Sequence, residues 1–288
     1  MDRVAAESLE SMGEYATLFC VQPWLDFDSV SSSLVVTEFG SRSSVAQSMC
    51  DTGMQLWSIR REFNVDWVSP ADLIGRVRDT AARPILISEA TDAPTARGSG
   101  DHTGLMACLL PFTEALKSCI YLVDPQFAKR AELAGVGAAI ERELGASIDA
   151  RYSQPRYVHA RVEHISDGRF TARGPAFHGC NFSMGLTTVL SIQGLRIITA
   201  SKPVMMIDRE PYRSQGVDPA TQDVVGIKSP LLFRAAYQFI SDTVIHLDSS
   251  GPCRGRLDKV EFSKISRPIY PVDDFEWSPP KLERIDLL

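Results

Sequence analysis

The chain has no long apolar run, no excess of basic residues and no paired cysteine motif. Nowhere do about 18 apolar residues follow one another, so the sequence predicts no membrane-spanning helix. Acidic residues (36) outnumber Lys and Arg (30), giving a net charge of −6. This charge argues against a general binder of nucleic acid or anionic membranes, because both need a basic surface. Small molecules, peptides and other proteins remain as partners.

The six cysteines are scattered and include no C-x-x-C pair. In a chain of 288 residues we expect them to be reduced, buried and apolar in character rather than a disulfide framework. The first residues also lack the apolar core of a secretory signal. The sequence therefore favours a cytoplasmic protein.

Segments typical of strands and of helices alternate through the first 135 residues. Strands are expected at 15–21, 33–39, 83–88 and 118–123, and helices at 43–63, 69–82, 103–115 and 124–135. The last helix has Asp124 as a cap, Pro125 at its start and Gly135 at its end. This alternation predicts an α/β segment with a parallel sheet layered by helices.

From about residue 136 the pattern changes to short strands joined by glycine-containing turns. An antiparallel meander is expected from strands at 156–165, 169–177, 186–192 and 195–200. A helical turn in 208–219, a strand at 223–228, a helix at 229–240 and a strand at 242–248 follow. We therefore predict an α+β domain at 136–270 and an extended tail at 271–288.

The first 135 residues supply only three or four strands, which is few for so many helices. We therefore expect this segment to be the C-terminal remainder of an incomplete α/β domain.

One loop carries most of the chemistry. It reads TDAPTARGSGDHT, covers 91–103, and joins the strand ending at Ser88 to the next helix. Such a loop lies at the carboxyl edge of a sheet, where open α/β sheets bind ligands. Gly98 and Gly100 permit positive φ and close backbone approach. Asp92, Asp101 and His102 could bind a ligand or transfer protons. Alternatively, Asp101 only caps the helix and the glycines only turn the chain.

A second candidate is the segment KSPLLFRAAY, which begins at Lys228. Lys228 closes a strand, and Ser229-Pro230 begins a predicted helix, so Lys228 and the helix terminus could hold a carboxylate or a phosphate. Arg234 could add a bidentate contact. The alternative is a capped helix in which Arg234 forms a structural ion pair.

The residues do not nominate a metal site or a nucleophile within the chain. The five histidines include no H-E-x-x-H or H-x-H, and a catalytic zinc needs about three converging protein ligands. Asp101 and His102 could supply one or two ligands. No G-x-S-x-G elbow is present, and the glycine-rich loop lacks the Gly-Lys-Ser/Thr ending of a P-loop. We therefore predict no metal ligands here and leave the catalytic residues unknown.

The loop resembles a signature of the microcystinase C (MlrC) family of zinc metallopeptidases, A-D-N-P-G-G-G-x-x-G-D-x-T, at identical spacing. Asp92, Pro94, Gly100, Asp101 and Thr103 match the signature. Further segments resemble family signatures in the same order, and together they cover nearly the whole chain: QPWLDFDSV, DPQFAKRAELAGVGAAIERELGA, SDGRFTARGP, IDREPYRSQGVDP and VGIKSPLLFRAAYQFISDTVIHLDSSGP.

The loop departs from the family at four positions. Ala93, Thr95, Ala96 and Arg97 replace one asparagine and three glycines of the signature. The sequence leaves open whether Arg97 and His102 redirect specificity or abolish turnover.

The resemblance implies hydrolysis of peptide or amide bonds in small peptides by zinc-activated water. Asp92, Gly98, Gly100, Asp101 and His102 would line the substrate cleft. Lys228 and Arg234 would hold a substrate carboxylate.

The family carries its zinc ligands in a preceding N-terminal stretch, so we expect this chain alone to bind no zinc and to be inactive. A longer natural chain or a complementary N-terminal chain would have to supply the ligands. The alternative is a non-catalytic binding or assembly module from a truncated or split gene, which could form a homo-oligomer. The natural substrate, the oligomeric state and whether Met1 is the true start are not fixed by the sequence.

Overall fold

The computed structural model describes residues 15–22, 24–37 and 43–279. The chain divides into two compact units. The smaller contains the described residues up to 65 and from 257 onward, and the larger contains residues 66–256. No described helix combines the length and the apolar character needed to cross a bilayer.

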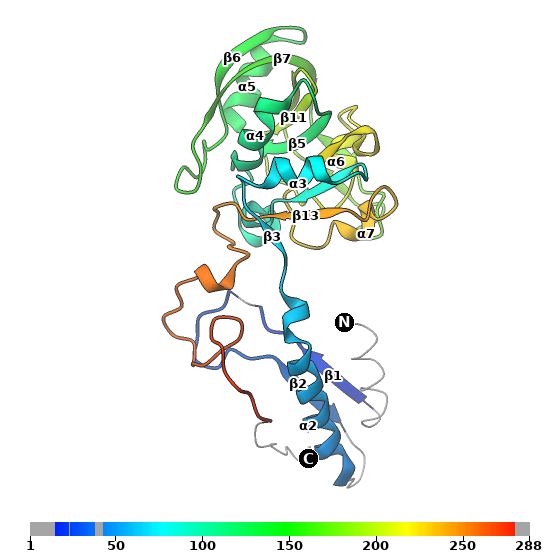
Figure 1. The fold of residues 1–288 in the computed structure, drawn as a ribbon. Coiled ribbons are helices and arrows are strands. Elements are labelled where there is room, and N and C mark those ends of the chain that lie inside the picture. The colour runs from blue at the N-terminus through cyan, green and yellow to red at the C-terminus, as the bar shows by residue number, and fades with distance from the viewer. Residues whose placement is uncertain (1–14, 23, 38–42, 280–288) are drawn as a thin grey trace. The chain divides into compact units, whose positions relative to one another are not determined.

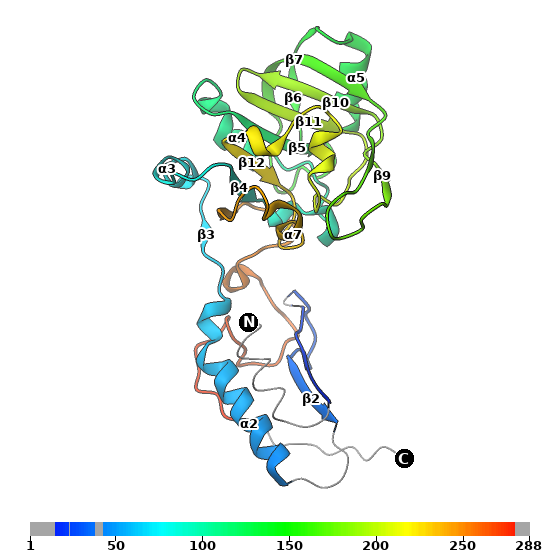
Figure 2. The same ribbon diagram turned by 90° about the vertical axis from the view of Figure 1, so that its right-hand side faces the viewer.

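The larger unit is built on one nine-stranded sheet (Figures 1 and 2). Its first six strands in sheet order pair in parallel, and the last three pair antiparallel as a meander. The order is β3 (Trp67–Val68), β13 (Val244–Leu247), β4 (Ile85–Ser88), β12 (Val224–Ile227), β5 (Ser118–Val123), β11 (Leu195–Ala200), β10 (Thr187–Ile192), β7 (Arg156–Ser166) and β6 (Ala139–Leu144).

The central strands are apolar on both faces because both faces of the sheet are covered. In β4, Ile85 and Ile87 enter one core, whereas Leu86 enters the other. The first core lies beneath α3 (Leu73–Asp79), α4 (Gly104–Leu109) and α5 (Pro125–Ala134). The second is closed by α6 (Glu210–Arg213), α7 (Arg234–Tyr237) and the hairpin of β8 (Arg169–Thr171) and β9 (Asn181–Ser183).

Helix α5 begins and ends as its sequence predicts. The Asp124 carboxylate accepts a hydrogen bond from the Phe127 N–H at 3.0 Å, and Pro125 occupies the first turn. Gly135 ends the helix with a φ of 85°. Short 3₁₀ turns connect other elements: η1 (Arg60–Phe63), η2 (Ala90–Asp92), η3 (Pro94–Ala96), η4 (Leu110–Phe112), η5 (Pro219–Thr221) and η6 (Leu257–Lys259).

The smaller unit joins the two ends of the described chain. Strands β1 (Tyr15–Phe19) and β2 (Ser33–Thr37) pair antiparallel, and α2 (Ser43–Ser58) contacts β2. The Asp26 carboxylate accepts hydrogen bonds from the N–H groups of residues 263–265. The Trp57 ring packs against three aromatic rings of the C-terminal segment, those of Tyr270, Phe275 and Trp277.

The fold class is α/β, as predicted, but the sheet is assembled differently. The strands before residue 135 do not form a small sheet of their own, because β11, β12 and β13 pair beside β4 and β5 in the same sheet. Residues 1–135 and 136–270 therefore both contribute strands to the same sheet. Strands β1 and β2 pair with each other and not with the parallel strands.

Several helices are shorter than the sequence predicts, among them α2, which ends at Ser58, and α3, which is limited to Leu73–Asp79. The helix expected at 103–115 is α4 followed by η4, because Pro111 supplies no N–H for an α-helical bond. The helix expected at 229–240 is reduced to the four residues of α7. In the predicted tail, residues 271–279 contain no helix or strand, and 280–288 lie outside the described residues.

Candidate functional site

The candidate site lies where β4 and β12 end side by side in the sheet. Ser88 and Ile227 are register partners at these ends, so Glu89 and Lys228 emerge next to each other. Both side chains are only 3% exposed. The parallel register thus brings together two charged residues that are 139 positions apart in sequence.

The Lys228 ammonium is the centre of a buried cluster. Its Nζ donates to Glu89 Oε2 at 2.6 Å, to Asp92 Oδ2 at 3.0 Å and to the carbonyl oxygen of His102 at 3.2 Å. Burial by itself would lower the pKa of Lys228, but the charges of Asp92 and Glu89 raise it above its ordinary value. All three ammonium hydrogens are used within the protein. Lys228 therefore has none left for the substrate carboxylate that the sequence assigned to it.

Glu89 is the member of the cluster that the sequence reasoning missed. Burial by itself would raise its pKa, but the Lys228 charge, with further contributions from His102, lowers the pKa to about 2. Its Oε1 lies 3.2 Å from His102 Nδ1. Glu89 directly follows a buried strand at the ligand-binding edge of the sheet, and this position was the available signal.

The carboxylates of Asp92 and Asp101 are buried and accept hydrogen bonds from backbone N–H groups. Asp92 accepts from the Gly100 N–H at 2.9 Å and from the His102 N–H at 2.8 Å. Asp101 Oδ2 accepts from the N–H groups of Ile148 and Asp149, and Ser99 donates to Oδ1. Asp101 is therefore not the cap of α4, whose first flanking residue makes no side-chain cap bond. The two carboxylates fix the loop and tie it to the segment before β7.

The loop glycines have the predicted backbone roles, close approach at Gly98 and positive φ at Gly100, but neither is among the residues that line the cleft. A Cβ on Gly98 would lie 2.5 Å from the carbonyl carbon of Asp92, so the backbone passes too close for any side chain. Gly100 has a φ of 79°. Arg97, which replaces a glycine of the family signature, has a φ of 67° in the left-handed region that favours glycine.

His102 connects the buried cluster to a surface cleft. Its side chain is 6% exposed. Nδ1 faces Glu89, whereas Nε2 lies 3.0 Å from both the Tyr152 carbonyl oxygen and the Ser250 hydroxyl. The ring is thus held from both sides.

Arg234 has different partners from Lys228. Its guanidinium is exposed, and Nη2 lies 3.2 Å from His246 Nε2. Burial and the Arg234 charge lower the pKa of His246. The contacts of Arg234 are therefore with β13 and not with the buried cluster.

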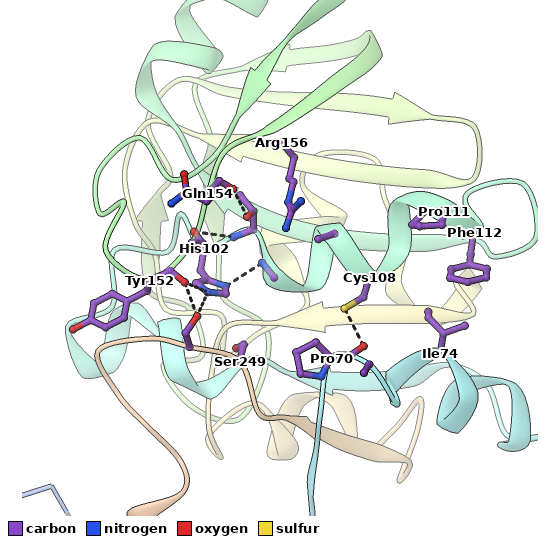
Figure 3. Close-up of a pocket in the computed structure, with 16 residues that line it drawn as sticks. Pro70, Ile74, His102, Cys108, Pro111, Phe112, Tyr152, Gln154, Arg156 and Ser249 are labelled. Carbon is purple, nitrogen blue, oxygen red and sulfur yellow. Dashed lines mark hydrogen bonds between the residues drawn. The ribbon is translucent and has the colours of Figure 1, made fainter. Parts of the chain in front are cut away.

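A cleft of about 570 Å³ opens beside His102 (Figure 3). It is bounded by the start of α4 and by the segments that follow β3 and β13 and precede β7. The lining residues are Pro70, Ala71, Ile74, His102, Thr103, Gly104, Ala107, Cys108, Pro111, Phe112, Tyr152, Ser153, Gln154, Arg156, Ser249 and Ser250.

The site does not fit a metal centre made of the described residues. Within those residues, no group of three or more His, Cys, Asp and Glu side chains could hold a metal ion. The nearest carboxylates, Glu89, Asp92 and Asp101, are already neutralised by Lys228 or bonded to backbone N–H groups. A divalent ion would have to displace these partners.

The fold and the site define an α/β protein with a buried charged cluster and an open cleft at the carboxyl edge of its parallel strands. The family model described as the MlrC C-terminus matches residues 87–264, which is more than half of the chain, so the chain belongs to this family.

Two similar proteins support this assignment. Microcystinase C of Sphingomonas sp. is 24% identical over 252 residues, which are 85% of this chain and 45% of the relative. The crystal structure of a candidate metallopeptidase of Mesorhizobium sp. BNC1 matches with a TM-score of 0.78 and 23% identity, over 96% of this chain and 56% of that one. The chain thus spans about half the length of the proteins it matches.

Proposed function

We propose that this chain is the C-terminal portion of an MlrC-like zinc metallohydrolase that cleaves peptide or amide bonds in small peptides. Family membership, and the names of the two similar proteins, support a hydrolase with a metal cofactor. In this proposal the described residues bind and position the peptide. The metal ligands come from polypeptide outside them, either a longer natural chain or a complementary N-terminal chain.

The observation that carries the proposal is the position of His102. Its ring forms part of the cleft wall, and behind it Glu89 and Lys228 form an ion pair shielded from water. Burying charged groups costs free energy that burying apolar side chains of similar size does not. Buried charged groups beside a cleft are therefore typical of binding and catalytic sites. We assign His102 to contact the substrate, and Glu89 and Lys228 to hold the ring in place.

The remaining candidates act on the shape of the loop. Asp92 and Asp101 accept backbone hydrogen bonds, and Gly98 and Gly100 let the chain turn without side chains in the way. These four residues therefore keep the cleft wall rigid. We assign none of them to proton transfer.

The experiment compares the purified chain alone and mixed with the N-terminal half of microcystinase C. Zinc content is measured by elemental analysis, and cleavage of short linear peptides by mass spectrometry. We expect about one zinc per complex and cleavage only in the mixture. His102→Gln should reduce cleavage, whereas His159→Gln, at an exposed position on β7, should not.

Two results would contradict the proposal. Tight binding of one zinc and peptide cleavage by the chain alone would show that the ligands lie within it. A mixture that forms a stable complex and binds zinc but cleaves no peptide would favour the alternative, a non-catalytic binding or assembly module.

A further inference from the structure

We propose that the cleft binds the C-terminal end of a peptide, with Arg156 holding its free carboxylate and the adjacent apolar wall holding an apolar last side chain. This inference rests on the proposed function, because it names the kind of peptide that the hydrolase would select. It replaces Lys228 and Arg234 as the residues expected to hold a carboxylate.

The charge of the cleft favours an anionic group. The chain carries six more acidic than basic residues, yet the residues lining the cleft include Arg156 and no Asp or Glu. The carboxylate of Glu89 is screened from the cleft by His102 and is paired with Lys228. A carboxylate entering the cleft therefore meets a cation and no fixed anion.

Arg156 is well placed to act as the anchor. It is the first residue of β7, and its backbone is paired with Leu144 of β6, so its Cα position is set by the sheet. The side chain extends from the strand toward α4 (Figure 3). Arg156 is exposed, and in the part of the chain that the structure describes its guanidinium makes no ion pair or hydrogen bond. Its planar fork can bind a carboxylate through two parallel hydrogen bonds.

The other polar groups of the cleft are less available. The Tyr152 carbonyl oxygen accepts a hydrogen bond from the Ser250 hydroxyl and faces His102 Nε2. The Thr103 hydroxyl donates to the Gln154 carbonyl oxygen at 2.7 Å. These groups bond to one another, whereas Arg156 offers unused donors.

Apolar side chains form the wall on the other side of Arg156. Figure 3 shows Pro111, Phe112 and Ile74 together there, away from His102 and Tyr152. The Phe112 ring has the guanidinium of Arg78 over it, with 4.9 Å from Arg78 Cζ to the ring centroid. This contact helps to hold the ring in place. Burying an apolar side chain against such a wall adds to the affinity that the carboxylate supplies.

The geometry therefore specifies the ligand as a carboxylate next to an apolar group. A peptide that ends in Phe or Leu with a free C-terminus has this arrangement. A peptide with an amidated C-terminus or a small polar last residue lacks one of the two features.

The test measures binding by the full chain, without reference to turnover. Ala-Ala-Ala-Phe with a free carboxylate, its C-terminal amide and Ala-Ala-Ala-Ser are titrated by calorimetry at 50 mM salt. We expect the acid to bind about fivefold more tightly than the amide, the size typical of an exposed charge pair. This preference should shrink at 500 mM salt because exposed charges are screened.

Variants assign the effect to the cleft. Arg156→Gln should abolish the preference for the acid, and Arg156→Lys should retain part of it, because lysine keeps the charge but not the fork. The matched control is Arg142→Gln, at an exposed arginine of the neighbouring strand β6 that does not line the cleft. Phe112→Ala should remove the preference for a terminal Phe over a terminal Ser.

The outcomes separate this inference from the proposed function. Preferential binding of the acid that depends on Arg156 supports the inference even if no peptide is ever cleaved. Equal affinity for the acid and the amide, no measurable binding, or an unchanged preference in a folded Arg156→Gln protein would overturn it. Cleavage of peptides without this preference would leave the proposed function standing and refute the inference alone.

Discussion

Replacing Lys228 with Met should destabilise the larger unit by about 3–5 kcal/mol at pH 7, the usual cost of removing one partner of a buried ion pair. The variant leaves Glu89 and Asp92 buried without their shared cation. The depression of the Glu89 pKa from 4.5 to about 2, caused by Lys228 and His102 together, gives an order of magnitude for the stabilisation of this one carboxylate. It corresponds to about 3 kcal/mol, which agrees with the lower end of the range.

The effect should depend on pH in a defined direction. In the wild-type protein the folded-state pKa of Glu89 lies below the unfolded value, so its contribution is complete above about pH 5 and is lost as the pH falls toward 2. Without Lys228, the burial of Glu89 raises its pKa, and the carboxyl takes up a proton more readily in the folded state. The stability difference between the variant and the wild type should therefore narrow between pH 7 and pH 5.

The measurement is urea unfolding, monitored by hydrogen exchange in peptides that contain β4 and β12. A local probe is needed because the chain has two units, and a global signal would mix their transitions. The control is Lys129→Met. Lys129 and its partner Glu132 form an exposed ion pair, so this substitution should cost less than about 1 kcal/mol. A loss below about 1 kcal/mol for Lys228→Met, or a difference that does not change with pH, would refute the assignment of a buried ion pair.

Three further predictions test other parts of the structure. Gly98→Ala should lower the free energy of unfolding in urea by about 1–3 kcal/mol, because the added Cβ would collide with the backbone. Arg97→Gly should be neutral or stabilising, because glycine adopts the left-handed backbone conformation of this position without strain. Thr188→Val should be neutral or stabilising in thermal melts, because the buried Thr188 hydroxyl has no hydrogen-bond partner among the described residues. Thr187→Val loses a 2.8 Å bond to the Gly185 carbonyl oxygen and should cost about 1 kcal/mol. Asp26→Asn should speed proteolysis within residues 257–279. Hydrogen bonds, chiefly from the Lys264 N–H, lower the Asp26 pKa to about 2, so proteolysis of this segment in the wild type should also become faster as the pH falls from about 4 to 2.

Local patterns predicted most elements of the fold but not their assembly. The cap and stop of α5 and the two strands of the β10–β11 hairpin depend on neighbouring residues, so the sequence shows them directly. The insertion of β11, β12 and β13 beside β4 and β5 depends on contacts between residues far apart in sequence. Local sequence patterns do not indicate the order of strands in the sheet. For this reason the sequence alone predicts an incomplete sheet before residue 135.

The candidate site shows the same division. The loop could be placed at the carboxyl edge of a strand, and the roles of Gly98 and Gly100 follow from their residue type. The pairing of Lys228 with Glu89 could not be read from the sequence, because it results from the parallel register of β4 and β12. For this reason the sequence alone predicts that Lys228 holds a substrate carboxylate, whereas its charge is used inside the protein.

The residues that resemble the family signature and those that line the cleft have largely different physical roles. Asp92, Asp101 and Thr103 form hydrogen bonds with the backbone of the loop and of the segment before β7, and Asp92 also binds the Lys228 ammonium. Arg156 and Phe112 lie within the family match but outside the segments that resemble family signatures, and they present charge and apolar surface to the cleft. The matched signature residues therefore shape the frame of the cleft, whereas the two residues that we propose to select the peptide make no side-chain bond within that frame. Exchanging Arg156 should change the preferred peptide while leaving the stability of the chain nearly unchanged, because surface substitutions of this kind usually alter stability by less than about 0.5 kcal/mol.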